Sequence, residues 1–146
     1  MRPVGRRRSG HPGRAGLGVI EGWMLVDGSA AGHALVLEDP LSFWGGLDPS
    51  TGEIIEAGHP QRGEVVTGRI LVMPSGRGSS SSATVLAEAI RAGTAPAGIV
   101  LGEPDDIIVI GALVAAELYG VAIPVFVASP DGYATIRDGD QVSLVP

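Results

Sequence analysis

Apolar residues in the second half of the chain follow two periods, one typical of strands and one typical of helices. Short apolar runs predict buried strands at residues 65–73, 98–101, 123–127 and 141–145. Apolar positions three and four residues apart predict helices over residues 79–92 and 106–119. Strands and helices that alternate in this order pair in parallel for at least part of a sheet.

The two predicted helices carry end signals. The first ends at Gly93, a residue type that readily takes the left-handed C-cap conformation. The second begins after Asp105 or Asp106, either of which can cap it. Its predicted apolar face comprises Ile107, Ile110, Val114 and Leu118. Gly111 lies in the middle of this helix and should weaken it locally.

The first half of the chain is less regular. Residues 18–22 and 33–38 have the composition of strands, whereas residues 40–63 form a long insertion rich in turn signals. The insertion contains Phe43 and Trp44, which we expect to face an active-site cleft or a subunit seam, because long loops with aromatic residues are commonly functional. Together, these patterns predict an α/β fold, a β/β/α domain with a mixed sheet.

Charge divides the chain into a tail and a body. Five of the ten arginines lie in the first fourteen residues, in a Gly- and Pro-rich segment without hydrophobic periodicity. We expect residues 1–16 to be a disordered basic tail or the product of an upstream start codon, with a basic arm as the alternative. Residues 17–146 form the expected domain. They hold all sixteen acidic residues, which argues against nucleic-acid binding.

Missing residue types narrow the chemistry. The sequence has no cysteine, which excludes disulfides, thiolate nucleophiles and cysteine-held metal clusters within this chain. It has no lysine, which excludes a lysine Schiff base. All three histidines lie in the first sixty residues without metal-ligand spacing, and we expect His59 at the surface and His33 on a strand. Because no apolar run is long enough to span a membrane, we expect a cytoplasmic protein without a membrane partner.

Candidate chemistry is concentrated at a glycine- and serine-rich turn that joins the strand at residues 65–73 to the following helix. Residues 74–83 read Pro-Ser-Gly-Arg-Gly-Ser-Ser-Ser-Ser-Ala. A helix N-terminus favours an anion, and an arginine can pair with a carboxylate through two hydrogen bonds. One serine is enough to cap a helix, so four in a row favour a function beyond capping. A structural turn with a serine cap is the other interpretation. The missing lysine excludes a P-loop.

Residues 69–82, with Gly76-Arg77-Gly78-Ser79-Ser80 at their centre, resemble the small subunit, or swivel domain, of aconitase X. Two further motifs match in order, at residues 41–49 and 93–101, and the resemblance covers residues 18–145. It implies a swivelling β/β/α domain that docks on a large subunit. The large subunit would hold an iron–sulfur cluster and most of the substrate pocket, and no cofactor is expected on this chain alone.

The same resemblance assigns roles within the turn. Swivel domains of the aconitase superfamily supply a serine base from such a turn, which implies Ser79 as the base here. The implied substrate-binding residues are Ser75, Arg77, Gly78 and Ser80. Aconitases follow these serines with an arginine, and Ser81 stands there instead, so the substrate should differ from citrate and isocitrate. Family members are hydro-lyases in which, by this resemblance, the serine removes a proton while the cluster iron helps the hydroxyl depart.

Members of the family dehydrate one of two small hydroxy acids, cis-3-hydroxy-L-proline or mevalonate 5-phosphate. The composition, rich in Ala, Gly and Arg, is typical of a GC-rich genome and favours a bacterial enzyme and hydroxyproline. One other function stays open, a non-catalytic binding or assembly module of the same fold. A phosphohistidine carrier is rejected unless His59 faces the Gly/Ser turn, because the sequence has no histidine beyond His59.

Overall fold

Parallel strands form the centre of the sheet in this computed structural model, which describes residues 2–4 and 20–146. These strands are β3 (Ala30–Val36), β4 (Ile70–Met73), β5 (Gly98–Leu101) and β6 (Val125–Ala128). All residues of β4, β5 and β6 are buried. Continuous apolar runs are typical of parallel strands because both faces of the sheet are covered.

The outer strands make the sheet mixed. On one side, β2 (Gly22–Val26) pairs antiparallel with β6. On the other side, β7 (Gln141–Leu144) pairs antiparallel with β3, and β1 (Arg2–Val4) pairs parallel with β7. The described strands follow the order β1-β7-β3-β4-β5-β6-β2. This arrangement confirms the predicted α/β fold with a mixed sheet.

Two apolar cores lie on the two faces of the sheet, because successive side chains of a strand point to opposite faces. The core on the helix side contains Leu71, Met73, Ile99, Leu101, Leu86 and Ile108. The core on the opposite face contains Ile70, Val72, Val100, Phe126, Val142 and Leu144. The side chains of β4 alternate between the two cores, so this one strand is anchored in both. That anchoring fixes the position of the carboxyl end of β4 and of the turn that follows it.

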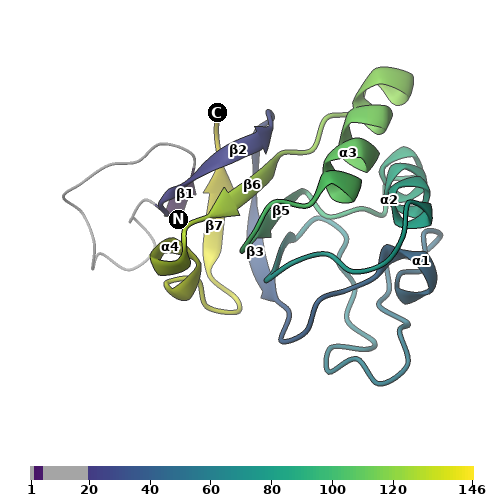
Figure 1. The fold of residues 1–146 in the computed structure, drawn as a ribbon, viewed down its shortest axis with the longest axis horizontal. Helices are drawn as coiled ribbons and strands as arrows, with labels where there is room; N and C mark the ends of the chain where they lie inside the picture. Colours follow the sequence, from purple (N-terminus) through teal and green to yellow (C-terminus); the bar gives the residue numbers. More distant parts are fainter. Residues whose placement is uncertain (1, 5–19) are drawn as a thin grey trace.

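Four helices accompany the sheet in the described part of the chain: α1 (Phe43–Gly46), α2 (Ser81–Ala92), α3 (Asp106–Tyr119) and α4 (Pro130–Ala134). Figure 1 shows α2 and α3 side by side on one flank of the sheet, with α1 next to α2 and α4 at the other end. Among the described residues, no helix has the length and apolar character needed to cross a membrane.

The long insertion between β3 and β4 is held in place by its own contacts. Leu47 bridges Ile54, and both side chains are buried in the helix-side core. Asp48 accepts hydrogen bonds from the backbone N–H and the hydroxyl of Ser50, and these bonds lower the pKa of Asp48 below its ordinary value. The insertion is thus a folded part of the domain that packs beside α2.

Several predicted boundaries hold and others shift. β5 and α3 have their predicted limits, and α2 ends at Gly93, whose φ of +80° confirms the left-handed cap. The strand predicted at residues 18–22 corresponds to β2, which begins later, at residues 22–26. Residues 18 and 19 of the predicted range fall outside the described residues. β4 begins at Ile70 instead of residue 65, because the backbone of residues 64–66 bonds within the insertion. The turn predicted at residues 129–132 is the start of α4, capped by Ser129.

The expected basic tail, residues 1–16, falls mostly outside the described residues. Within it, Arg2–Val4 forms β1, which pairs with β7.

The predicted apolar face of α3 does not face the core of the domain. Ile110 is 51% exposed and Leu118 is 66% exposed. The residues that point into the domain are Ile108, Gly111, Ala112 and Ala115. Gly111 is required by packing, since a Cβ built there would lie 2.9 Å from the backbone oxygen of Ala83 in α2. Small residues let the two helices approach closely, so the core face is the less hydrophobic one.

We predict that Gly111→Ala destabilises the isolated chain by about 1–3 kcal/mol, because the extra methyl group overpacks the α2–α3 contact. Helix propensity alone predicts the opposite sign, a gain of about 1 kcal/mol. Urea denaturation followed by circular dichroism measures the difference. Leu113→Ala, at an exposed position of the same helix, is the control and should change stability by less than about 0.5 kcal/mol. A Gly111→Ala variant as stable as the parent would contradict the packing argument.

Candidate active site

The glycine- and serine-rich turn lies at the carboxyl ends of parallel strands β4 and β5, where open α/β sheets commonly bind ligands. The backbone N–H of Gly102, just after β5, donates to the carbonyl of Pro74 at 3.0 Å and so joins the two strand ends. Gly76 forms a bridge with Leu41 of the insertion. Three segments far apart in the sequence therefore converge at this edge of the sheet.

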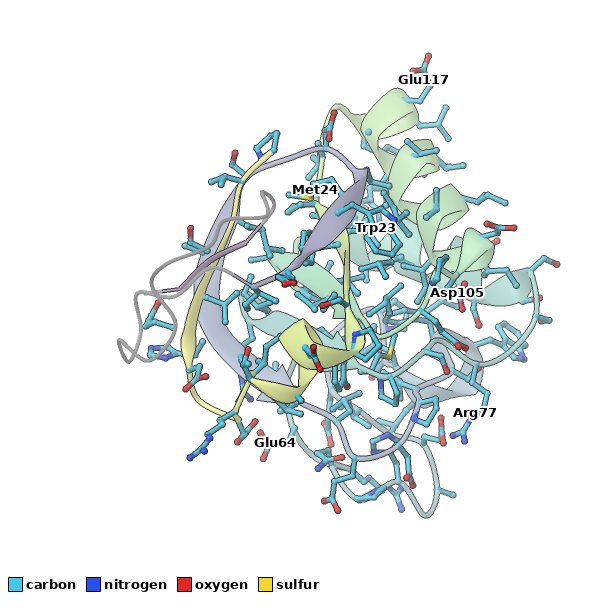
Figure 2. All side chains as sticks on the ribbon, turned by 60° about the vertical axis from the view of Figure 1, so that its left-hand side comes forward. Trp23, Met24, Glu64, Arg77, Asp105 and Glu117 are labelled. Carbon is cyan, nitrogen blue, oxygen red and sulfur yellow. The ribbon has the colours of Figure 1, made fainter. Side chains whose placement is uncertain are left out.

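Asp105 supports the turn from the α3 side. Its side chain accepts a hydrogen bond of 3.0 Å from the backbone N–H of Ile108, which confirms the predicted helix cap. A Cβ on Gly76 would lie 2.5 Å from the other carboxylate oxygen, so Asp105 and the turn are in close contact. Figure 2 shows Asp105 and Arg77 on the same side of the molecule, near the end of α3 that is opposite Glu117.

A small hollow lies beneath the turn. Its walls come from the turn, the insertion and α3, and include Leu41, Phe43, Gly76, Gly78, Asp105 and Ile108. The volume of this hollow is about 10 Å³, which is room for one water molecule. A hydroxy acid does not fit inside it. Any such ligand must lie above the turn, on the side that this chain leaves open.

The turn presents its first two serines outward. Ser79 and Ser80 are exposed, as are Arg77 and Gly78, and Ser75 is half-buried. The Ser79 hydroxyl accepts a long hydrogen bond, 3.4 Å, from the backbone N–H of Ser81. Ser80 occupies the N-cap position of α2, and within the described structure its side chain makes no capping hydrogen bond. Ser79 and Ser80, like Ser81 after them, thus present exposed hydroxyls at the positive end of this helix.

Gly78 cannot be replaced by a residue with a side chain without rearrangement. Its φ of +114° is unfavourable for other residues, and a Cβ would lie 2.6 Å from the Ser42 hydroxyl and 2.8 Å from the Ser82 hydroxyl. The close packing brings the turn directly onto the insertion. The sequence predicted Gly78 as a site residue, and the structure shows the backbone conformation that requires glycine there.

Ser82 has a structural task that the sequence analysis missed. It is buried, and its hydroxyl accepts a hydrogen bond of 3.2 Å from the backbone N–H of Trp44. The Ser42 hydroxyl donates to the Trp44 carbonyl at 2.9 Å, so the 3.4 Å contact between the two serines has Ser82 as donor. One of the four serines is therefore used to fasten α1 to α2, which weakens the argument from serine redundancy.

Arg77 is held by the insertion. Its guanidinium forms an ion pair with Glu56, whose side chain is 20% exposed. The second carboxylate oxygen of Glu56 accepts a hydrogen bond from the backbone N–H of Ser42 at 3.2 Å. Glu56 thus connects the Arg77 side chain to the segment that Ser82 also binds. The sequence carried no signal for this pair, because Glu56 and Arg77 are twenty-one positions apart with irregular structure between them.

Two expectations about the insertion need correction. Phe43 is 1% exposed and belongs to the helix-side core, so it does not face a subunit seam, whereas Trp44 is 63% exposed. His59 is buried instead of lying at the surface. Its Nδ1 accepts from the Gln61 N–H at 3.0 Å, so Nε2 carries the proton and donates to the Asp39 carbonyl at 3.1 Å. His33 lies on β3, as predicted.

The residues of this chain do not fit an iron–sulfur cluster. The sequence contains no cysteine to ligate iron, and no group of three or more His, Asp or Glu side chains in the described part of the chain could hold a metal ion.

Comparison with known proteins decides the family. A model of the aconitase X swivel domain matches residues 19–146. The chain belongs to this family. The structure of aconitase X from Thermococcus kodakaraensis in its holo-form matches with a TM-score of 0.76 and 32% identity, over 85% of this chain and 88% of that one. The resemblance seen in the turn and the two flanking motifs is thereby confirmed for the whole domain.

Curated relatives of the swivel domain carry two names. Cis-3-hydroxy-L-proline dehydratase of Pseudomonas aeruginosa is 50% identical over 69% of this chain and 17% of its own length. The phosphomevalonate dehydratase small subunit of Methanopyrus kandleri is 41% identical over 83% of this chain and 86% of its own. The chain thus spans about a fifth of the length of the hydroxyproline dehydratases that it matches, 17% and 21% for the two compared.

We predict that Ser82→Ala lowers the free energy of unfolding by about 1 kcal/mol, because the part-buried N–H of Trp44 loses the buried hydroxyl that accepts its hydrogen bond. Urea denaturation checks this value. Ser81→Ala, at the exposed neighbouring position, is the matched control and should be nearly neutral. Equal effects of the two substitutions would show that the Trp44 contact does not stabilise the fold.

Glu56→Gln tests the connection between the insertion and the turn. We expect a loss of about 1 kcal/mol, because the Glu56 carboxylate bridges a guanidinium and a backbone N–H with little exposure. Glu64→Gln is the matched control, since Glu64 pairs with Arg69 at a side-chain exposure of 49% and an exposed pair is worth about 0–1 kcal/mol. A larger loss in Glu64→Gln would reverse the assignment of the structural pair.

Proposed function

We propose that this chain is the small subunit of an aconitase X-type hydro-lyase, with Ser79 as the base that removes a proton from a small hydroxy acid. The observation that carries the proposal is the different use of the serines in the turn. Ser82 is buried in the scaffold, whereas Ser79, Ser80 and Ser81 are exposed, and Ser79 is the one of these that directly follows Gly78. A hydroxyl at the positive end of a helix is stabilised when it becomes an alkoxide, which is the form that accepts a proton.

The proton transfer is an elimination. Ser79 Oγ would take the proton from the carbon next to the substrate carboxylate. The electron pair of that C–H bond forms the new double bond, and the hydroxyl group departs from the adjacent carbon as hydroxide. That hydroxide leaves as water once it takes up a proton, and the large subunit would supply the group that assists its departure. Arg77 would bind the carboxylate, which favours loss of the neighbouring proton, while Gly78 and Ser80 lie against the substrate and Ser75 supports it from the strand side.

The rest of the active site would come from a large subunit. Two observations support this: the hollow beneath the turn is too small for a hydroxy acid, and this chain matches about a fifth of the hydroxyproline dehydratases. Relatives of similar length are themselves named small subunits. The iron–sulfur cluster expected from the resemblance would be held by the large subunit, because this chain has no cysteine.

We propose cis-3-hydroxy-L-proline as the substrate, with mevalonate 5-phosphate as the alternative. The turn offers the guanidinium of Arg77, paired with the carboxylate of Glu56, and the carboxylate of Asp105 lies close to Gly76 of the same turn. This mixture of charges suits a zwitterion with one carboxylate and one ammonium group better than a molecule that carries a carboxylate and a phosphate. The higher identity to the hydroxyproline enzyme supports the same choice.

Turnover by the reconstituted enzyme tests the proposal. The chain is co-expressed anaerobically with the large subunit from the same organism, and both substrates are offered separately. We expect cis-3-hydroxy-L-proline to be dehydrated and Ser79→Ala to lower kcat about 10²–10⁴-fold, the contribution of a positioned general base. Ser81→Ala is the control and should retain the parent rate.

Three other results would change the assignment. Turnover of mevalonate 5-phosphate alone would replace the substrate. Full activity of Ser79→Ala would exclude Ser79 as the base. No turnover of either substrate by a complex with its cluster intact would favour a binding or assembly module. A phosphohistidine carrier is already disfavoured, since both ring nitrogens of His59 bond within the insertion.

A further inference from the structure

An apolar groove runs between α2 and α3 on the outer surface of the domain. It has a volume of about 600 Å³, and its lining is mostly apolar. Ala83 and Ala87 of α2 line one side, and Ile110, Val114 and Leu118 of α3 line the other. We refer to these five residues as the helix groove. The three α3 residues are 38–66% exposed, and they belong to the apolar face that the sequence pattern predicted for this helix.

The sequence of α3 is typical of a helix whose whole surface, including the side that lines the helix groove, is buried. In its fourteen residues only Asp106 and Glu117 are charged, and they lie near the two ends of the helix. A helix that is apolar on all sides is typical of a fully buried position. Yet the domain covers only the face with Ile108, Gly111, Ala112 and Ala115. Soluble proteins rarely leave such a contiguous apolar surface open unless a partner binds there.

We propose that the large subunit docks an apolar element in the helix groove, an inference that rests on the proposed function. Continuity with the candidate site supports this occupant. Ser80, the neighbour of Ser79, lines the near end of the groove, and Ile107 lines both the groove and the hollow beneath the turn. A subunit that closes the open side of the turn therefore reaches the groove without leaving the surface.

Charge defines the chemistry of the docking element. The rim of the groove is acidic: Glu103 and Asp106 are exposed near one end, and Glu117 near the other. Glu88, on the α2 side, forms an ion pair with Arg91 and so adds no net charge to the rim. The complementary element is an apolar helix or strand with Lys or Arg at its flanks.

The same charges disfavour two other occupants. An anionic membrane surface would be repelled by the acidic rim, since peripheral helices bind membranes with basic flanks. A second copy of this chain would bring Asp106 and Glu117 against identical carboxylates in a two-fold pairing, and like charges at an interface oppose association. A large subunit can have the complementary charge, whereas a copy of this chain cannot.

Leu118→Glu tests the docking surface. Leu118 is the most exposed of the groove residues, so the substitution should leave the fold of the isolated chain unchanged. We expect affinity for the purified large subunit of the same organism, measured anaerobically by titration calorimetry, to fall about 100-fold because a carboxylate enters an apolar seam. Val145→Glu, at a comparably exposed apolar position outside the groove, is the matched control and should bind like the parent.

Binding and turnover separate this inference from the proposed function. With the small subunit in saturating excess, Leu118→Glu should recover the parent kcat, whereas Ser79→Ala should bind normally and turn over slowly. If the parent chain binds the large subunit and Leu118→Glu binds equally well, the docking surface is wrong and the proposed function stands. If the parent chain does not bind the large subunit, the proposed function fails first. A dimer of the isolated chain that Leu118→Glu abolishes in analytical ultracentrifugation would assign the groove to a second copy.

Discussion

The close approach of α2 to its two neighbours is the constraint on which the rest of the structure depends. On one side, Gly111 lets α3 approach until only a hydrogen atom fits between its Cα and the backbone of Ala83. On the other side, the hydroxyl of Ser82 binds the backbone of Trp44 in the insertion. Both contacts involve the first turn of α2, so they fix the helix at the end that carries the candidate active site. The rest of α2 packs through Leu86, Ala89 and Ile90 and follows from that placement.

Because of this arrangement, the residues that hold the turn in place differ from the residues that the turn exposes. Ser42, Ser82 and Gly78 pack closely where the insertion meets the turn, and a side chain on Gly78 would lie within 2.6 Å of the Ser42 hydroxyl. Ser79 and Ser80 are exposed, and Arg77 is held by Glu56 of the insertion. In the proposed function, a general base must be held in place while its hydroxyl stays accessible, and close packing beside an exposed serine meets both conditions. A substrate carboxylate would then compete with Glu56 for the Arg77 guanidinium.

The local pattern of apolar and capping residues was sufficient to predict the helices and strands whose limits depend on nearby residues alone. The strand Gly98–Leu101 is a short buried run, and α3 has an Asp cap and a Gly end, so both were predicted with their limits. The start of β2 and the burial of His59 depend on contacts with residues distant in sequence, and no periodicity encodes them. At the site, the Gly/Ser turn was visible because its composition is unusual. Glu56 was not, since its role arises only when the insertion folds back onto the turn.

The exposure of the apolar face of α3 is informative because that face would ordinarily be buried. The stripe of Ile107, Ile110, Val114 and Leu118 is the more hydrophobic side of the helix, and burial of large aliphatic groups usually decides which side faces the core. In this domain the side of α3 with Gly111, Ala112 and Ala115 is buried instead, because close helix packing requires small residues. The small-residue face packed on the domain and the large aliphatic face left exposed are both explained if α3 has a second neighbour on its outer side. The sequence then describes α3 as it lies in an assembly, and the isolated domain shows only the inner half of that environment.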